Sequence, residues 1–381
     1  MMPTVVVSAF NVASFPGGGG HMWVYLQYVL GLHRLGCNVY WMERFVRTKD
    51  AKRDETAIRT FFSRMASFGL TGRAVLLADP LPGEGEQLVT LGLSQNQTDA
   101  LIRDADLLLN FHYAIDPGLL GRFRRTAVVD IDPGLFQFWL SRKQLQVPRH
   151  DVYLTTGETV GQPGTLVPDV GVTWAYIRPP ISLEEWDFSL DPSRRHMTTV
   201  STWDSVNYVK DGTSVYENTK RATFLDFKAL PKFTDQTLEL ALFLRTTADY
   251  RDRRLMERHG WRICHTRDVA ASPAAYRAYI QQSRGEFSCA KRSCMKFQNA
   301  WVSDRTLCYL ASGKPVVVQD TGPSKLLPNG EGMFRFTTLE DAARALDCVN
   351  ADYVRHCHAA RALAEQFDAK RVAARILEIA L

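Results

Sequence analysis

Hydrophobic runs recur along the whole chain, and their spacing alternates between that of strands and that of helices. Short unbroken runs at 5–9, 107–109 and 127–129 predict buried strands in the first half, and the segment from Met22 to Leu35 has helical spacing. The second half continues this alternation, with strands predicted at 198–203, 238–244, 261–264 and 316–318. Strands separated by helices are typical of parallel sheets covered on both faces, so the pattern predicts an α/β fold.

The clearest succession of elements lies at 301–322. Apolar positions at helical spacing predict a helix that begins beside Ser303 and ends at Gly313, where glycine can adopt a left-handed conformation. Pro315 prevents the helix from continuing, and three valines at 316–318 predict a strand covered on both faces. The loop at 320–322 leaves that strand at its carboxyl end, where ligands bind in open α/β sheets. Because an exposed helix N-terminus also attracts anions, we expect a phosphate-bearing ligand here.

Two segments have weaker patterns. Positions 48–105 are charged and favour helices, with a surface turn at 81–85. Positions 207–220 are polar and rich in turn residues, which predicts an insertion or a mobile loop.

Composition narrows the class of protein. A length of 381 residues allows two domains, and 45% hydrophobic residues supply enough apolar material for two cores. A net charge of +5 suits a nucleotide ligand but is too evenly spread to indicate nucleic acid by itself. No apolar run is long enough to span a bilayer, and no basic region precedes the run at 5–9, so we expect a cytoplasmic protein. The seven cysteines form no Cys-x-x-Cys pair or zinc spacing, which favours reduced thiols and no metal site.

The run Ala-Ser-Gly-Lys-Pro-Val-Val-Val-Gln-Asp-Thr-Gly at 311–322 resembles the nucleotide-sugar signature of glycosyltransferases with the GT-B architecture. The resemblance implies two Rossmann-like domains facing a cleft, with the sugar-nucleotide diphosphate at the helix N-terminus. It also implies an acidic residue inside that helix for the ribose hydroxyls, and Cys308 occupies the position here. Asp304 and Glu286 are the candidate replacements.

The same resemblance suggests a division of the chain. A double proline at 179–180 and the polar sequence after it predict a boundary. We expect an acceptor-side domain at 1–180, a linker at 181–197, a nucleotide-sugar domain at 198–350, and helices at 351–381 that return to pack on the first domain.

The resemblance also implies donor contacts from the loop after the first strand of the second domain, through Thr202 and Trp203, and from Lys291, whose charge would neutralise a diphosphate. The predicted donor-binding residues are Thr202, Trp203, Glu286, Lys291, Ser303, Asp304, Arg305, Asp320, Thr321 and Gly322.

The acceptor and the catalytic base are expected in the first domain. The loop Gly17, Gly18, Gly19 and Gly20 follows the first strand, and four glycines allow the backbone to approach a ligand closely. Three groups that follow strands or loops on that side are candidate bases: Asp132, His21 and His112. Asp132 is preferred because it follows a buried strand and is fixed by the Pro-Gly pair after it. A retaining reaction would need no such base.

These observations predict a glycosyltransferase that moves a sugar from a nucleotide diphosphate, most simply a UDP-sugar, to an acceptor hydroxyl. No metal or other cofactor is required in principle, because a helix dipole, backbone N–H groups and a cation can stabilise the leaving diphosphate. The acceptor stays open between a small molecule, a nucleoside or modified DNA base, and a glycan. Two alternatives share the scaffold: a sugar-nucleotide epimerase and a non-catalytic nucleotide- or carbohydrate-binding protein.

Overall fold

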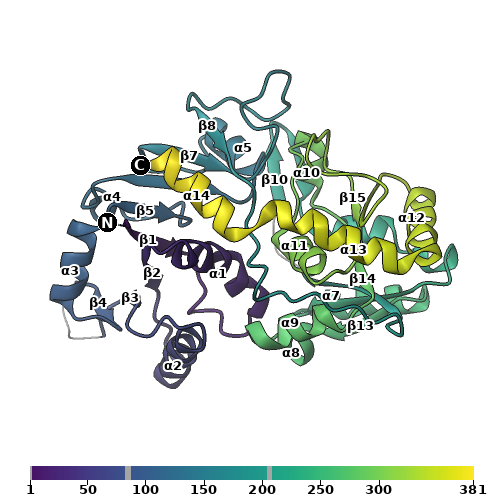
Figure 1. The fold of residues 1–381 in the computed structure, drawn as a ribbon, viewed down its shortest axis with the longest axis horizontal. Coiled ribbons are helices and arrows are strands. Elements are labelled where there is room, and N and C mark those ends of the chain that lie inside the picture. Colours follow the sequence, from purple (N-terminus) through teal and green to yellow (C-terminus); the bar gives the residue numbers. More distant parts are fainter. Residues whose placement is uncertain (1, 82–86, 204–207) are drawn as a thin grey trace.

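The computed structural model describes residues 2–81, 87–203 and 208–381. In this part of the chain, two parallel sheets lie side by side, each covered by helices (Figure 1). The first sheet has eight strands in the order β4-β3-β2-β1-β5-β6-β7-β8, parallel except for β4. Its strands are β1 (Thr4–Ala9), β2 (Asn38–Phe45), β3 (Ala74–Ala78), β4 (Val89–Leu91), β5 (Leu107–Asn110), β6 (Thr126–Asp130), β7 (Val152–Thr155) and β8 (Trp174–Tyr176).

The second sheet has six parallel strands in the order β13-β12-β9-β14-β15-β16. Its strands are β9 (His196–Thr202), β12 (Thr237–Phe243), β13 (Arg262–His265), β14 (Gly285–Ser288), β15 (Val316–Gln319) and β16 (Met333–Phe336). The strand order reverses between β1 and β5 in the first sheet and between β9 and β14 in the second. In open α/β sheets, ligands bind at such switch points, beside the carboxyl ends of the strands.

Helices cover both faces of the first sheet. These are α1 (Gly19–Arg34), α2 (Ala51–Ser67), α3 (Gln95–Asp104), α4 (Pro117–Leu120) and α5 (Leu135–Ser141). Val5 and Val7 face the core shared with α1, whereas Val6 belongs to a separate cluster with Ile102 of α3. This split follows from the period of two in a strand, which turns alternate side chains to opposite faces.

The helices of the second half are α6 (Lys220–Asp226), α7 (Thr247–Arg258), α8 (Thr266–Val269), α9 (Pro273–Gln281), α10 (Arg292–Phe297), α11 (Asp304–Ala311), α12 (Leu339–Ala351), α13 (Tyr353–Ala364) and α14 (Ala369–Ala380). Single-turn 3₁₀ helices lie at Leu230–Lys232 and Glu365–Phe367. The last helix, α14, crosses back to the first half and packs on α1, where a Cβ on Gly31 would lie 2.4 Å from the carbonyl oxygen of Ala369 (Figure 1). None of the helices in the described ranges is long and apolar enough to cross a membrane.

Two segments differ from the sequence-based prediction. The stretch 48–105 contains β3 and β4 in addition to helices. Ala74–Ala78 consists of alanine and leucine apart from one valine, and both residue types also favour helices, so this short run does not differ from its helix-favouring surroundings. Within the predicted insertion, the described residues form a hairpin of β10 (Tyr208–Asp211) and β11 (Ser214–Glu217). The turn predicted at 81–85 lies, apart from Leu81, outside the described residues, as does Asn207.

The hairpin connects the two halves of the molecule. Val209 is fully buried in an apolar cluster with Leu135 and Phe138 of α5. Asp211 pairs with Arg142 at 2.8 Å and with Lys296 at 2.5 Å, so it joins cations from both halves. These contacts hold the two sheets in one arrangement around the cleft between them.

Candidate active site

A cleft of about 370 Å³ lies between the two sheets, at the carboxyl ends of their strands. The first half contributes the glycine loop, the start of α1 and the turn after β6. The second half contributes the end of β9, the start of α6 and the segment that leads into α11. Residues from the first half are Phe15, Gly17, Gly18, Gly19, Gly20, His21, Ile131, Asp132 and Thr156, and those from the second half include Thr202, Thr219, Lys220, Phe243, Tyr276, Lys291, Ser303, Asp304 and Arg305.

The N-terminus of α11 opens into this cleft. Ser303 has the extended backbone of an N-cap, but its side chain makes no capping hydrogen bond. The helix ends as predicted, with Gly313 in the left-handed region at a φ of 67°. The first-turn N–H groups and the Ser303 hydroxyl therefore face the cleft without the usual side-chain cap, as a site for an anion requires.

Lys220 and Lys291 supply positive charge to the same cleft. Burial lowers the pKa of Lys220 to about 7, and the neighbouring Arg305 charge acts in the same direction. The Lys220 ammonium also lies 5.7 Å from the centre of the Trp301 ring. A doubly charged phosphate group beside Lys220 would favour its protonated form and so bind more strongly to it.

Arg305 also lines the cleft, but its guanidinium is held by partners within the protein. Its guanidinium donates to Glu286 at 2.7 Å, to the Val200 carbonyl at 3.0 Å and to the Ser288 hydroxyl at 2.6 Å. Burial opposes the charge of Arg305, but the Glu286 carboxylate outweighs it, so the pKa of Arg305 is raised. Glu286 is fully buried in this pair. We conclude that the pair fixes α11 against β14, and Asp304 beside it also lines the cleft.

Asp132 lies opposite, in the turn between β6 and α5. Its N–H donates to the carboxylate of Asp130 at 3.0 Å, and Asp130 is itself fully buried. The Asp132 carboxylate accepts from the Lys291 ammonium at 2.9 Å, across the cleft. The side chain of Asp132 is 42% exposed and that of Lys291 27%, so both remain open to a ligand.

His21 lies in the first turn of α1, beside the same cleft. Its Nε2 is 2.8 Å from the carbonyl oxygen of Phe10, and because a carbonyl can only accept, Nε2 carries the proton. Burial lowers the pKa of His21, so the ring is neutral at pH 7 and Nδ1 keeps a lone pair. The ring also contacts Phe15 and Tyr25, which holds it in place despite the glycines before it. His112 does not share this site, since it lines a separate cavity.

The glycine loop is packed against the second half of the molecule. A Cβ on Gly19 would lie 2.2 Å from the Ser272 carbonyl oxygen, and one on Gly20 would lie 2.6 Å from the Tyr276 ring. Gly19 also donates its N–H to the Ala270 carbonyl at 3.2 Å. Two of the four glycines therefore allow close approach of the two halves, whereas a Cβ on Gly17 would meet open space.

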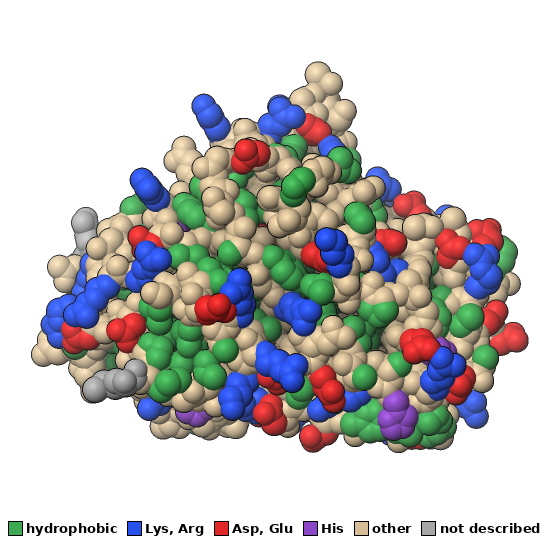
Figure 2. Space-filling view, turned by 45° about the horizontal axis from the view of Figure 1, so that its top comes forward, with side chains coloured by type: hydrophobic (Ala, Val, Ile, Leu, Met, Phe, Trp, Pro, Cys, Tyr) green, Lys and Arg blue, Asp and Glu red, His purple; other side chains and the backbone are tan. Residues whose placement is uncertain are grey.

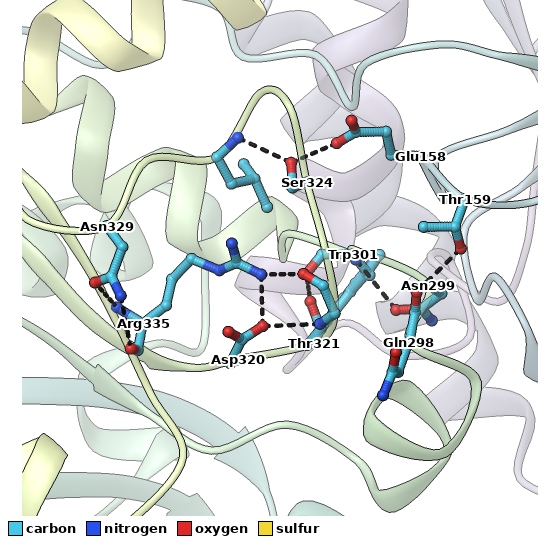
Figure 3. A network of polar contacts seen from close by, with 12 residues as sticks. Glu158, Thr159, Gln298, Asn299, Trp301, Asp320, Thr321, Ser324, Asn329 and Arg335 are labelled. Atoms are coloured by element: carbon cyan, nitrogen blue, oxygen red, sulfur yellow. Dashed lines mark hydrogen bonds and ion pairs between the residues drawn. The ribbon is translucent and has the colours of Figure 1, made fainter. Parts of the chain in front are cut away.

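Not every predicted donor residue lies at the cleft. Thr202 does, but the neighbouring Trp203 is fully buried in the second core, and its indole donates to Asp252 at 3.0 Å. The loop after β15 supports the site from behind, as Figure 3 shows: Arg335 pairs with Asp320, and Thr321 donates to the Trp301 carbonyl at 2.8 Å.

Gly322 in that loop has a φ of 123°, and a Cβ there would lie 2.6 Å from the Gln298 carbonyl oxygen. Glycine is needed at this position because the backbone of 298 passes so close. On the other side of this segment, Gln298 accepts from Thr159 at 3.0 Å, and Asn299 donates to the Pro133 carbonyl at 2.6 Å. The loop at 320–322 therefore helps to hold the segment before α11 against the first half.

Sequence reasoning missed several residues of the cleft. From the sequence, Lys220 is only the last residue of the polar segment 207–220, and no pattern marks it as a ligand-binding residue. The aromatic residues of the cleft were missed because, in the sequence, an aromatic side chain that lines a ligand site cannot be distinguished from one that packs in the core. The missed residues that line the cleft include Phe15, Thr219, Lys220, Phe243 and Tyr276. Among the residues that the structure describes, no three His, Cys, Asp or Glu side chains gather in a way that would hold a metal ion.

The fold and this cleft define the class of architecture: the chain has the GT-B fold, which confirms the sequence-based prediction. One similar solved structure is an alpha-glucosyltransferase in complex with UDP, with 13% identity, 100% of this chain and 99% of that chain covered, and a TM-score of 0.62. The same identity, coverage and score apply to an alpha-glucosyltransferase with UDP-glucose and DNA containing an abasic site. HepE of Anabaena, in complex with UDP-glucose, is 12% identical over 99% of this chain and 98% of its own, with a TM-score of 0.61. No protein-family model and no curated protein matches the sequence.

Proposed function

We propose that this protein is a glycosyltransferase that moves a sugar, most simply a hexose from a UDP-sugar, to an acceptor hydroxyl. The observation that carries the proposal is the uncapped N-terminus of α11 facing one cleft with Lys220, Lys291 and Asp132. The similar GT-B structures contain UDP or UDP-glucose, which supports the choice of donor. A soluble cytoplasmic location agrees with the sequence composition and remains part of the proposal.

In this account the diphosphate lies at the N-terminus of α11. The Ser303 hydroxyl and first-turn N–H groups donate to its oxygens, and Lys220 and Lys291 neutralise its charge. These groups also stabilise the charge that develops on the leaving diphosphate, so the reaction proceeds without a metal ion. Asp304 accepts from the ribose hydroxyls in place of the buried Cys308.

The transfer step involves one bond formed and one broken at the sugar. The acceptor oxygen bonds to C1 of the sugar while the bond from C1 to the β-phosphate oxygen breaks, and that electron pair leaves with UDP. The hydroxyl proton passes to Asp132, which lies opposite the donor groups. Donor binding favours this role, because a diphosphate competes with Asp132 for the Lys291 ammonium and so releases the carboxylate.

A panel of UDP-, dTDP- and GDP-sugars tests the proposed reaction. We expect release of the nucleoside diphosphate, fastest from UDP-sugars, slowly with water and faster with simple alcohols and glycosides. Conversion of the donor sugar without release of nucleoside diphosphate would instead identify an epimerase. Binding without any turnover would identify a binding protein.

Asp132→Asn tests the proposed base. An amide cannot accept the proton, so we expect transfer to fall by roughly 10²- to 10⁴-fold. UDP should bind at least as tightly as to the wild type, because Lys291 loses its partner. His21→Ala, assayed alongside, tests the second candidate base. Transfer by Asp132→Asn at near the wild-type rate would exclude this residue, and the configuration of the product at C1 would show whether the reaction needs a base.

The acceptor is proposed only as a hydroxyl compound. One group of similar structures contains DNA, so nucleic acid stays among the candidate acceptors. Figure 2 shows Lys and Arg side chains interspersed with Asp and Glu over one face of the molecule. This face therefore lacks the continuous basic track that a long polyanion would need, which supports a small or neutral acceptor there.

A further inference from the structure

A second cavity, of about 970 Å³, lies within the first half of the molecule. It is bounded by the face of the first sheet opposite α1 and by α3, β4 and α4, which Figure 1 places at the outer end of that half. Its volume is at the upper end of the range for small-molecule sites. It could not be predicted from the sequence, because its walls come from six separate segments of the chain.

The floor of this cavity, its buried part, is mostly apolar but includes Ser8 and Thr98, and its more exposed rim is mostly polar. Met42, Leu77 and Ile115 line the floor, and each is less than 9% exposed. Arg44 and His112 lie at the more exposed rim. Arg44 already pairs with Asp79, and a second rim arginine, Arg122, pairs with Asp99 at 2.6 Å. Asp116 also lines the cavity, and its carboxylate accepts from the Leu119 N–H at 2.8 Å. Because each of these charged groups already has a partner in the protein, the cavity suits a neutral ligand with an apolar body and a polar head.

Phe10 contacts one residue of the cleft and one residue of this cavity. Its carbonyl oxygen accepts from His21 in the cleft at 2.8 Å, and its ring stacks on His112 in the cavity with centroids 5.0 Å apart. The Phe10 side chain is 49% exposed, which is unusual for a large apolar ring. The hydroxyl of Tyr113 accepts from the Ile131 N–H at 3.1 Å and so ties the rim of the cavity to the turn that carries Asp132.

We propose that this cavity binds the apolar part of the acceptor, and that the hydroxyl-bearing head passes over Phe10 into the cleft. The acceptor class is therefore a neutral amphiphilic alcohol, such as an alkyl or aryl glycoside. The exposed Phe10 ring is the surface on which the sugar-like head packs, and His112 supports that ring from the cavity side. This inference rests on the proposed function for the transfer step, but the binding site itself can be tested without turnover.

Two glucosides with the same head separate the effect of the cavity from that of the cleft. Calorimetry should show that hexyl β-D-glucoside binds the wild type at least tenfold more tightly than methyl β-D-glucoside, because the longer chain buries more apolar surface. Leu119 lines the cavity and is partly buried, so Leu119→Trp places an indole in the space and should remove most of this difference. Leu145, equally partly buried but outside the cavity, provides the control Leu145→Trp.

Equal binding of the two glucosides by the wild type would overturn the proposal. So would an unchanged preference in a folded Leu119→Trp. If that variant does not fold, Phe10→Ala replaces it, since the exposed ring is not part of a core, and it should weaken binding of the hexyl compound at least several-fold. A UDP titration of the same proteins tests donor binding in the cleft separately from acceptor binding in the cavity. Absence of UDP binding would contradict the proposed function, but the difference in affinity between the two glucosides would still test the cavity.

Discussion

At the scale of single residues, the cleft contains ionisable side chains whose pKa is shifted by burial. Lys220 is the clearest case, because burial beside Arg305 lowers its pKa to about 7. Near neutral pH the free protein is therefore a mixture of charged and neutral Lys220. An arriving diphosphate favours the charged form, so binding of the donor is coupled to the uptake of a proton.

This coupling gives a measurable pH dependence. UDP affinity should fall as pH rises above 7, because protonating Lys220 then becomes part of the cost of binding. At pH 8 UDP binding should therefore be accompanied by net uptake of a proton, measured by calorimetry in buffers of different ionisation enthalpy. Lys220→Met should abolish the uptake and weaken binding about 10- to 100-fold. Lys325→Met, at an exposed lysine, is the control. Undiminished proton uptake by Lys220→Met would show that another group titrates.

Lys314 is a second buried lysine, and it has no role in the cleft. It is fully buried in the Gly-Lys-Pro turn, and within the described part of the chain its Nζ has no hydrogen-bond partner. Burial lowers its pKa to about 8 from a usual value of about 10.5. Between these two values the unfolded chain binds a proton that the folded protein does not, so the free energy of unfolding should rise with pH there.

Lys314→Met should therefore stabilise the protein. Methionine keeps most of the length and the apolar stem but removes a buried ammonium, so we expect the melting temperature at pH 7 to rise by a few degrees. Thermal unfolding at pH 7 and pH 9.5 measures this. The gain should shrink at the higher pH, where the wild-type lysine is already neutral. A lower melting temperature at pH 7 would mean that the ammonium has a favourable contact in the protein.

At the scale of elements, the turn from β6 to α5 positions the proposed base. Asp130 accepts from Gln137 at 2.7 Å, from Thr155 at 2.8 Å and from the Asp132 N–H at 3.0 Å. All three partners donate, so the network requires a carboxylate rather than an amide. Burial raises the pKa of Asp130 to about 7, and its contribution to stability therefore falls as pH rises from about 4 to 7.

Asp130→Asn should disrupt this turn. The new amide NH₂ would face a donor, leaving a buried hydrogen bond unmade, so we expect a loss of about 1–3 kcal/mol in the free energy of unfolding. Chemical denaturation at pH 7 measures it, with Asp347→Asn at an exposed site of α12 as the control. The pH dependence between 4 and 7 should also become shallower. A variant as stable as the wild type would show that Gln137 reorients to donate elsewhere.

The elements could be predicted from the sequence wherever one local pattern decided them. The valines before Gln319 and the glycine at 313 predicted a strand and a helix end, and both lie where expected. Ala74–Ala78 was missed, because its alanines and leucines favour helices as well as buried strands and only one residue, Val75, is β-branched. Trp203 was expected to contact the donor because it directly follows β9. Its large apolar ring is instead fully buried in the second core.

The site could be predicted only in part, for a different reason. Asp132, His21 and Ser303 lie at strand or helix ends, where the position in the chain indicates the position in the fold. The partners of a side chain are harder to predict: Arg305 lines the cleft as expected, but the sequence does not show that its guanidinium is paired with the buried Glu286. The cavity beside Phe10 was not predictable, since it depends on how distant segments pack.

At the scale of the whole molecule, the two halves form one site because several separate contacts hold them together. The hairpin joins Asp211 to cations of both halves, α14 packs on α1, and Asn299 donates to the Pro133 carbonyl. These contacts place the N-terminus of α11 opposite Asp132 across the cleft. The central claim follows from this geometry: the cleft between the two sheets holds a nucleoside diphosphate at the start of α11.

A structure of the protein with UDP bound tests that claim most directly. We predict that diphosphate oxygens lie within hydrogen-bond distance of the Ser303 hydroxyl or first-turn N–H groups of α11 and of the Lys220 ammonium. Lys291 should have moved from Asp132 toward the diphosphate. A diphosphate bound elsewhere, with the start of α11 and Lys220 free of contact, would contradict the account.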